Sequence, residues 1–193
     1  MQRFLCMPRL RQAQDAQLLR AMAHPLRLRL IDLLRKEGPA TASEAARRLG
    51  ESSGLTSYHL RVLERYGFIE DDPTRNGGRK RWWRAVDEGM EWSIENDDPS
   101  LMAAHSALGR QLVREYARRL GRWFAEVAGW DRSWRAAADS SEQWFELTPD
   151  ELRELSDEVL AVLERYADRR KPRDGTERAL VLFHAFPERR DDI

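Results

Sequence analysis

"ESSGLTSYHLRVLERYGFIE" (residues 51–70) is the stretch that decides the fold of this 193-residue chain. Thr56, Leu60 and Leu63 recur at helical spacing, which predicts a helix that begins after the N-cap residue Ser52 and buries these three side chains. The outward side of the same helix carries small and polar residues near its N-terminal end: Ser53, Gly54, Ser57, Tyr58 and Arg61. A glycine and a strand-like run follow directly, so the helix has a defined end.

The residues before this stretch predict a second short helix close to the first. In "TASEAARRLG" (residues 41–50), Thr41 and Glu44 form a capping box and Gly50 suits the helix end. Only a few residues separate the two helices, which is typical of a helix-turn-helix. Upstream, Pro25 and Gly38 suit the start and the stop of a further amphipathic helix.

The residues after it predict a basic hairpin. Two strand-like runs, "GFIEDD" and "RKRWWRAV", flank the turn "PTRNGG". Trp82 and Trp83 point to opposite faces of the second strand, so we expect at least one to pack against the helices. The loop and second strand are rich in cations: Arg75, Arg79, Lys80, Arg81 and Arg84. Such a hairpin after a recognition helix is typical of a wing, whose arginines lie along DNA phosphates or in the minor groove.

The charge is divided along the chain. The net charge is zero, but residues 1–91 hold 17 Lys and Arg against 12 Asp and Glu, whereas residues 92–193 hold 16 against 21. A basic front half favours a polyanionic partner, and an acidic back half indicates a different task.

The four segments "HPLRLRLIDLL", "ASEAARRLG", "SSGLTSYHLRVLERYGFIE" and "GGRKRWWRAV" together resemble the winged helix-turn-helix of the ArsR-like transcriptional regulators, in the branch without metal-site cysteines. The resemblance covers about residues 12–90. It implies a homodimer that binds pseudo-palindromic double-stranded DNA, with the fourth helix as reader. We expect a bacterial regulator in the cytoplasm, because "MQRFLCMPRL" (residues 1–10) shows no apolar secretory signal. It assigns to His59 a structural role or one beside a phosphate. The DNA-binding residues expected from the resemblance and the wing are Ser52, Ser53, Ser57, Tyr58, Arg61, Arg75, Arg79, Lys80 and Arg81.

Metal, cofactor, catalytic and membrane functions are not predicted. Metal-sensing relatives place cysteines where this chain has Ala45 and Ala46, and Cys6 is the single cysteine. We therefore expect no metal site and no cofactor. Glycine-rich phosphate loops, nucleophile elbows and zinc-protease motifs are absent from the sequence, so we do not expect an enzyme. No apolar run approaches the 18 or so residues of a membrane span.

The back half (residues 98–193) is predicted to begin with a helix of about thirty residues. Apolar residues three or four apart form one seam, and we expect the seam to pair with a second copy of the chain or to pack against the chain's own C-terminal part. The dimerisation residues predicted on it are Leu101, Leu108, Leu112, Tyr116, Leu120 and Trp123.

Residues 142–147 and 178–187 are predicted strands on either side of a helix that Thr148, Pro149 and Glu151 open. The expected fold is therefore α+β and mainly α: a winged helix-turn-helix at 12–90, then a dimerisation helix and a small strand-helix-strand module at 98–193. The module could bind a small-molecule effector, support dimerisation, or do both.

The functional alternative is a winged helix that binds protein rather than DNA. Such a module has no need of a basic wing, and it usually presents apolar residues on the outward face of the fourth helix. Here that face is polar and the wing is basic, so the sequence favours a DNA-binding transcriptional regulator.

Overall fold

The computed structural model describes residues 11–12, 16–75, 80–86, 90–91, 97–166, 169 and 173–189. The chain divides into two units, residues 1–135 and residues 136–193. The first unit thus contains the long helix that the sequence analysis placed with the second domain. The functional division into 12–90 and 98–193 stays a prediction.

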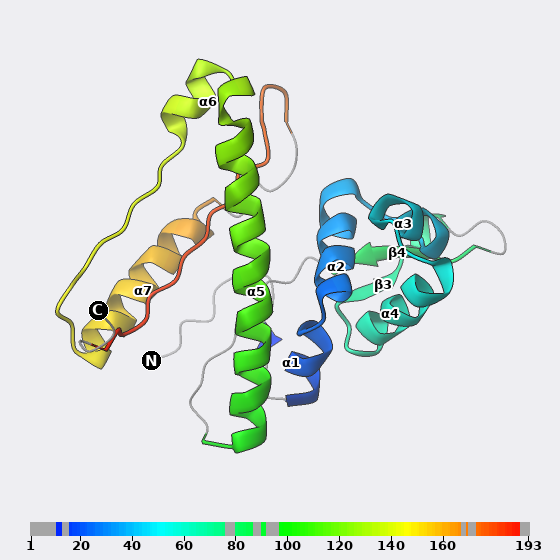
Figure 1. Ribbon diagram of the computed structural model, residues 1–193, viewed down its shortest axis with the longest axis horizontal. Helices are drawn as coiled ribbons and strands as arrows, with labels where there is room; N and C mark the ends of the chain where they lie inside the picture. Colours follow the sequence, from blue (N-terminus) through cyan, green and yellow to red (C-terminus); the bar gives the residue numbers. More distant parts are fainter. Residues whose placement is uncertain are drawn as a thin grey trace. The chain divides into compact units, whose positions relative to one another are not determined.

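The first unit is built mainly from helices (Figure 1). Their bounds are α1 Ala16–Met22, α2 Pro25–Glu37, α3 Ala42–Leu49, α4 Ser53–Arg65 and α5 Pro99–Glu126, followed by the 3-10 turn Val127–Gly129. The α2 helix begins as predicted, because Pro25 occupies its first turn and the His24 side chain accepts a hydrogen bond from the N–H of Leu26 (3.2 Å). It ends at Gly38, whose φ of 81° favours glycine.

A three-stranded antiparallel sheet completes the winged fold. Its strands are β2 Ala40–Thr41, β3 Ile69–Asp71 and β4 Trp82–Ala85, with β4 in the centre. Trp83 pairs with Ala40 on one side and Asp71 on the other. Trp83 is buried and Trp82 is half-buried, which confirms that the two rings take different faces and that one packs in the core. A short parallel pair, β1 Arg11–Gln12 with β5 Met90–Glu91, lies apart from this sheet.

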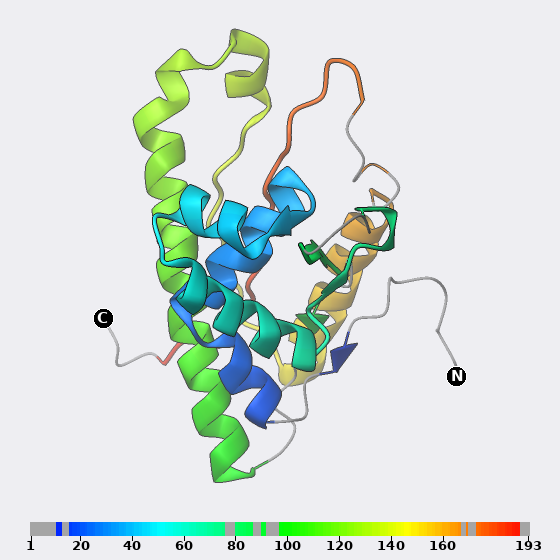
Figure 2. The ribbon, with the colours of Figure 1, turned by 90° about the vertical axis from the view of Figure 1, so that its right-hand side faces the viewer.

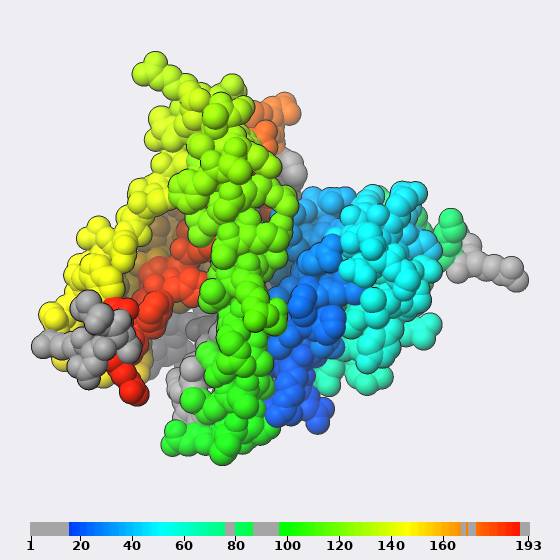
Figure 3. All heavy atoms as spheres, in the orientation of Figure 1, coloured from blue at the N-terminus to red at the C-terminus, as the bar shows by residue number. Residues whose placement is uncertain are grey.

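One hydrophobic core joins the helices of the first unit. It contains Leu30 from α2, Leu60 and Leu63 from α4, and Leu108 from α5, all of them almost inaccessible to solvent. In Figure 2, α3 and α4 face the viewer and α5 stands behind α1 and α2. Figure 3 shows α5 in green running beside the blue spheres of α1 and α2. The fourth helix is therefore held from behind by a packed scaffold.

The second unit holds the end of α6 Arg132–Ala137 and α7 Pro149–Glu164. The predicted α7 start is confirmed, because Thr148 and Glu151 form the expected capping box. The predicted strands at 142–147 and 178–187 are wrong: neither segment has strand structure. A strand is stable only when its N–H and C=O groups pair with a neighbour, and no such ladder forms here. The prediction of a mainly helical α+β fold is confirmed, but its sheet lies wholly in the first unit.

Candidate nucleic-acid interface

The turn between α3 and α4 sets the orientation of the candidate reading helix. Gly50 adopts a left-handed conformation (φ 68°), and its N–H bonds to the carbonyl of Ala46. The N–H of Glu51 bonds to the same carbonyl at 2.9 Å. Ser52 then caps α4, since its hydroxyl accepts a hydrogen bond from the N–H of Leu55 at 3.2 Å. Because capping uses an oxygen lone pair of Ser52, its O–H remains able to donate to a phosphate.

The inner face of α4 is packed as the sequence predicted. Thr56, Leu60 and Leu63 are completely buried. His59 is buried as well, at 5% exposure. These residues anchor the helix to α2 and to the sheet, so its outward face is presented on a rigid support.

The outward face of α4 is polar and accessible. Tyr58 is 61% exposed, Ser53 and Arg61 are exposed, and Ser57 is half-buried. The Tyr58 ring meets the edge of His59, with ring centroids 5.1 Å apart and planes at 74°. Within the described part of the chain, Arg61 forms no ion pair, so its guanidinium is available to an anion. The predicted DNA-binding residues of α4 are therefore gathered on one solvent-facing surface.

Two histidines lie beneath this surface. The rings of His24 and His59 stack at 4.3 Å with planes at 36°. Burial lowers the pKa of both imidazoles, and the nearby charge of Arg27 lowers each pKa further. Nδ1 of His59 is buried, and no hydrogen-bond partner for it occurs among the described residues. Both rings are thus held neutral at pH 7, and His59 has a structural place under Tyr58.

The base of the wing is ordered by Asp72. Its carboxylate accepts hydrogen bonds from the N–H of Thr74 (2.9 Å) and from the Thr74 hydroxyl (2.7 Å). These two bonds lower the pKa of Asp72, so the group is ionised at neutral pH. The backbone N–H of Asp72 bonds to the carbonyl of Trp82 at 2.9 Å, which extends the hairpin beyond the β3–β4 ladder.

Arg81 connects the wing to α4. Its Nε lies 2.7 Å from each carboxylate oxygen of Asp71, and its terminal nitrogens bond both oxygens of Glu64 on α4. The guanidinium also lies over the Trp83 ring, 4.0 Å from its centroid. The two carboxylates raise the pKa of Arg81. Arg81, a predicted DNA contact, therefore shares its positive charge with two acids of the same chain, Asp71 and Glu64. A DNA contact by Arg81 stays a prediction.

The remaining wing cations differ in how they are held. Arg75 lies over the Trp82 ring at 4.7 Å and 3.9 Å from Asp72. Arg84 pairs with Glu70 at 2.5 Å. Lys80 is exposed and forms no ion pair with any side chain in the described ranges. The predicted contact Arg79 lies outside the described residues.

The residues of the predicted dimerisation seam differ in how deeply they are buried. Leu101 and Leu108 are buried in the chain's own core, where α5 packs on α1, and Leu112 is half-buried against that core. Tyr116 and Trp123 are half-buried, and Leu120 is exposed. The second half of α5 also exposes Val113 (62%) and Phe124 (61%). The first half of the seam is thus occupied by α1, an N-terminal helix that neither sequence-based alternative considered.

Metal-ligand clusters and membrane-spanning helices do not occur in the described part of the chain. Over those residues, no three His, Cys, Asp or Glu side chains come together in a way that could hold a metal ion. Among the described helices, none combines the length and the apolar surface that a membrane crossing needs.

Sequence reasoning missed the acidic partners of Arg81 and the stacking of His24 on His59. Glu64 lies on the candidate reading helix, three residues after Arg61, whereas Arg81 lies on the wing. No helical or strand period relates the two positions, so the sequence does not predict their contact. Both contacts join residues far apart in the sequence, and only the fold brings them within reach.

A comparison with known families supports this geometry. A family model described as a helix-turn-helix domain matches residues 22–72, which run from the end of α1 to the base of the wing. Among curated proteins, no sequence matches the chain. The chain therefore contains a helix-turn-helix domain, which suggests a DNA-binding regulator.

Proposed function

We propose that this protein is a cytoplasmic, sequence-specific transcriptional regulator of the ArsR-like type that binds a pseudo-palindromic operator as a homodimer. The N-terminal winged helix-turn-helix (12–90) binds DNA, and the C-terminal part (98–193) supports dimerisation or sensing. The single observation that carries the proposal is the outward face of α4, where Tyr58 and Arg61 are exposed on a capped helix whose opposite face is fully buried.

The chemistry of this face suits a major groove. Ser53, Gly54 and Ser57 are small, so the helix N-terminus can approach the base edges closely. Arg61 can form a bidentate contact with guanine, and Tyr58 can donate to a phosphate or base edge. Lys80 and Arg75 lie on the adjoining wing, where cations contact the backbone.

Arg81 takes a different part in this proposal. Since Asp71 and Glu64 bind its guanidinium, Arg81 acts as a positioning residue that holds the wing at a set angle to α4. Its loss should weaken binding to every DNA sequence by a similar factor, because the wing loses its place while the base-reading residues stay.

Dimerisation is proposed through the second half of α5. Val113, Leu120 and Phe124 lie at i, i+7 and i+11, which places them on one face of the helix, and all three are exposed. A second copy of the chain is the occupant that would bring two reading helices to successive major grooves, roughly 34 Å apart. Sedimentation velocity should show a dimer for the native chain and a shift to monomer for Val113→Lys/Phe124→Lys.

A protein-binding winged helix remains the second candidate, and a specific observation favours it. Leu55 is 43% exposed on the first turn of α4, beside Tyr58. An apolar residue there suits a protein partner as well as a thymine methyl group.

The first experiment is a fluorescence-anisotropy titration of the full chain against random duplexes at two salt concentrations, with sequencing of the retained DNA. A palindromic motif and a loss of affinity at high salt are expected. Failure to retain DNA at low salt would leave two possibilities: an effector that DNA binding requires, or the protein-binding alternative.

Variants then assign the roles. Arg61→Ala should cost about 1–3 kcal/mol and relax the preference at one base position, whereas Arg79→Ala should weaken all sequences and reduce the salt dependence. Arg65→Ala is the matched control, because Arg65 is an exposed arginine on the same helix outside the proposed contact set. An equal effect of Arg61→Ala and Arg65→Ala would contradict the proposed reading face.

A further inference from the structure

A groove of about 750 Å³ lies between α2 and α5 in the first unit, with the end of α3 at its side. Leu28, Leu33 and Leu49 supply apolar surface to it. This groove is separate from the outward face of α4, and none of the residues assigned to DNA binding lines it.

The walls of the groove are strongly cationic. Three acids, Asp32, Glu37 and Glu115, also line it. The cations exceed them by three, in a chain whose net charge is zero. The cationic residues are Arg29, Lys36, Arg48, Arg114, Arg118 and Arg122.

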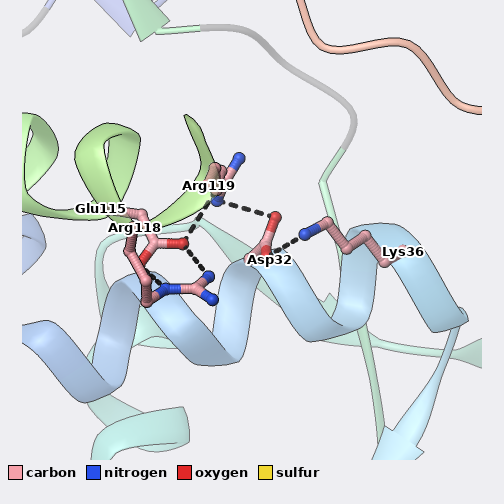
Figure 4. Close-up of polar contacts among 5 residues, drawn as sticks. All are labelled: Asp32, Lys36, Glu115, Arg118 and Arg119. Carbon is pink, nitrogen blue, oxygen red and sulfur yellow. Dashed lines mark hydrogen bonds and ion pairs between the residues drawn. The ribbon is translucent and has the colours of Figure 1, made fainter. Parts of the chain in front are cut away.

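Part of this charge is neutralised inside the chain. Lys36 pairs with Asp32 at 2.7 Å, and Arg48 pairs with Glu37 at 3.0 Å. Arg29 pairs at 3.2 Å with Glu51, an acid that does not line the groove. Figure 4 shows the network that joins the two walls: Arg119 of α5 contacts Asp32 of α2 at 3.0 Å. Within α5, Glu115 receives hydrogen bonds from Arg118 and Arg119. The network is thus an ionic clasp between α2 and α5.

Two arginines of the groove are left over. Over the described ranges, neither Arg114 nor Arg122 forms an ion pair, and both are exposed. Together with Arg118 they are spaced by four residues, so the three side chains leave α5 in a row that rises by about 6 Å per step. A guanidinium group can bind two oxygens of one phosphate at once, through two parallel N–H···O hydrogen bonds.

We propose that this groove binds an organic polyphosphate of the nucleotide type, with its phosphates on the Arg114–Arg118–Arg122 row and its ring against the leucines. The two unpaired guanidiniums of Arg114 and Arg122, with Arg118 between them, match a di- or triphosphate, whereas a monocarboxylate would neutralise one cation. The apolar surface distinguishes an organic polyphosphate from an inorganic one.

Such a ligand would act on the clasp. Phosphate groups compete with Glu115 for Arg118, which leaves the Glu115 carboxylate to Arg119 alone. Arg119 is then drawn away from Asp32, its ion-pair partner on α2, so binding weakens the contact between α5 and α2. Since α2 packs against the reading helix α4 and α5 carries the proposed dimer contact, the spacing of the two reading helices changes. This regulatory step rests on the proposed function, but the binding itself does not.

Isothermal titration of the full chain with adenosine tri-, di- and monophosphate, adenosine and inorganic tripolyphosphate tests the site. Affinity should fall in the order triphosphate, diphosphate, monophosphate, with adenosine not binding and tripolyphosphate weaker than adenosine triphosphate. Arg114→Ala/Arg122→Ala should weaken adenosine triphosphate by at least about tenfold, because two charge-assisted contacts are lost. Both substituted arginines are exposed, so the fold should persist, and circular dichroism checks that the double variant is folded.

Arg110→Ala/Arg132→Ala is the matched control, because it removes two exposed arginines that do not line the groove. Equal weakening in the two double variants would overturn the proposal by showing non-specific attraction. Absence of adenosine triphosphate binding would also overturn it. Operator binding by the ligand-free chain is measured separately, so a failure of the regulator proposal is distinguishable from a failure of this site.

Discussion

The two units of this chain contain the same local helix signal in different surroundings. Thr41 and Glu44 open α3 with a capping box, and Thr148 and Glu151 open α7 with another. Around α3, side chains such as Thr41 and Ala45 are buried in a shared core. In the second unit, no described residue is buried, and Trp144 and Phe186 are each more than 70% exposed.

The difference shows that local signals determine where helices begin, whereas burial determines how much free energy an element adds to the fold. A cap contributes about 0.5–2 kcal/mol, depending on its surroundings. A buried leucine contributes several times more, but only when other elements surround it. Substitutions at buried side chains and at caps should therefore have different costs in the two units.

The largest effect is expected from the core of the first unit. Leu60→Ala should lower the free energy of unfolding by about 2–5 kcal/mol, because the side chain is completely buried. Phe186→Ala in the second unit should change it by less than about 0.5 kcal/mol. Urea denaturation followed by circular dichroism measures both. A cost for Phe186→Ala equal to that of Leu60→Ala would contradict the contrast.

The ionic clasp of α5 should come next. Arg118 and Arg119 lower the pKa of Glu115 to about 2. Glu115→Gln should cost about 1–2 kcal/mol at pH 7, less than a buried pair because Arg118 is half exposed. Since the folded pKa lies below the usual 4.5, this stability is present above pH 4.5 and is lost as the pH falls toward 2.

Denaturation of the native chain and of Glu115→Gln from pH 7 to 3 measures this loss, and the variant should show a flatter acid limb. Arg153→Ala removes the exposed Asp150–Arg153 pair of α7 and is the control, with no measurable change expected. An acid limb of the same slope in Glu115→Gln would show that the clasp adds nothing.

The two capping boxes provide the closest comparison. Thr41→Ala should cost about 1 kcal/mol of global stability, because Thr41 is buried and also pairs with Trp82 in the sheet. Thr148→Ala should destabilise the first turn of α7 by about 0.5 kcal/mol, so that this turn frays. The unfolding midpoint of the first unit should not change. Hydrogen exchange of the two first turns separates local from global opening. Equal global costs would mean that surroundings do not matter here.

The smallest effect is a pH dependence at the stacked histidines. Their lowered pKa means that the folded state resists protonation, so stability is full above the usual 6.5 and declines as the pH falls below it. Denaturation midpoints between pH 7 and about 5 should therefore decrease for the native chain. The decrease should be smaller in His59→Gln and smaller again in His24→Gln/His59→Gln. A native midpoint that stays constant over this range would reject the buried pair as its source.

The sequence predicted the fold of the first unit well, because its signals there are local and agree with one another. Ser52 caps α4, Thr41 caps α3, and the period of Thr56, Leu60 and Leu63 identifies the buried face. The turn residues between β3 and β4 indicated the hairpin before any pairing was known. Periodicity, caps and turns all act within a few residues, so they can be read from the chain alone.

Prediction from the sequence failed where an apolar run was compatible with more than one structure or packing partner. Residues 178–187 have the composition of a buried strand, yet the segment forms none, since a strand depends on a partner that composition does not specify. The sequence predicts that the seam of α5 is one surface, but α1 covers Leu101 and Leu108 and leaves Val113 and Phe124 exposed. Which face of an amphipathic helix meets which neighbour is a property of the whole fold.

The sequence by itself determined the helix-turn-helix and its wing, together with the polar residues on the outward side of α4. Only the tertiary structure decided that Arg81 joins the wing to Glu64 and Asp71, that His24 stacks on His59, and that α5 faces α2 across a cationic groove. The physical reason is range. Caps and helical periods are set by residues within about four positions. Ion pairs, ring stacking and grooves join side chains from separate elements, whose distances exist only once the core has packed.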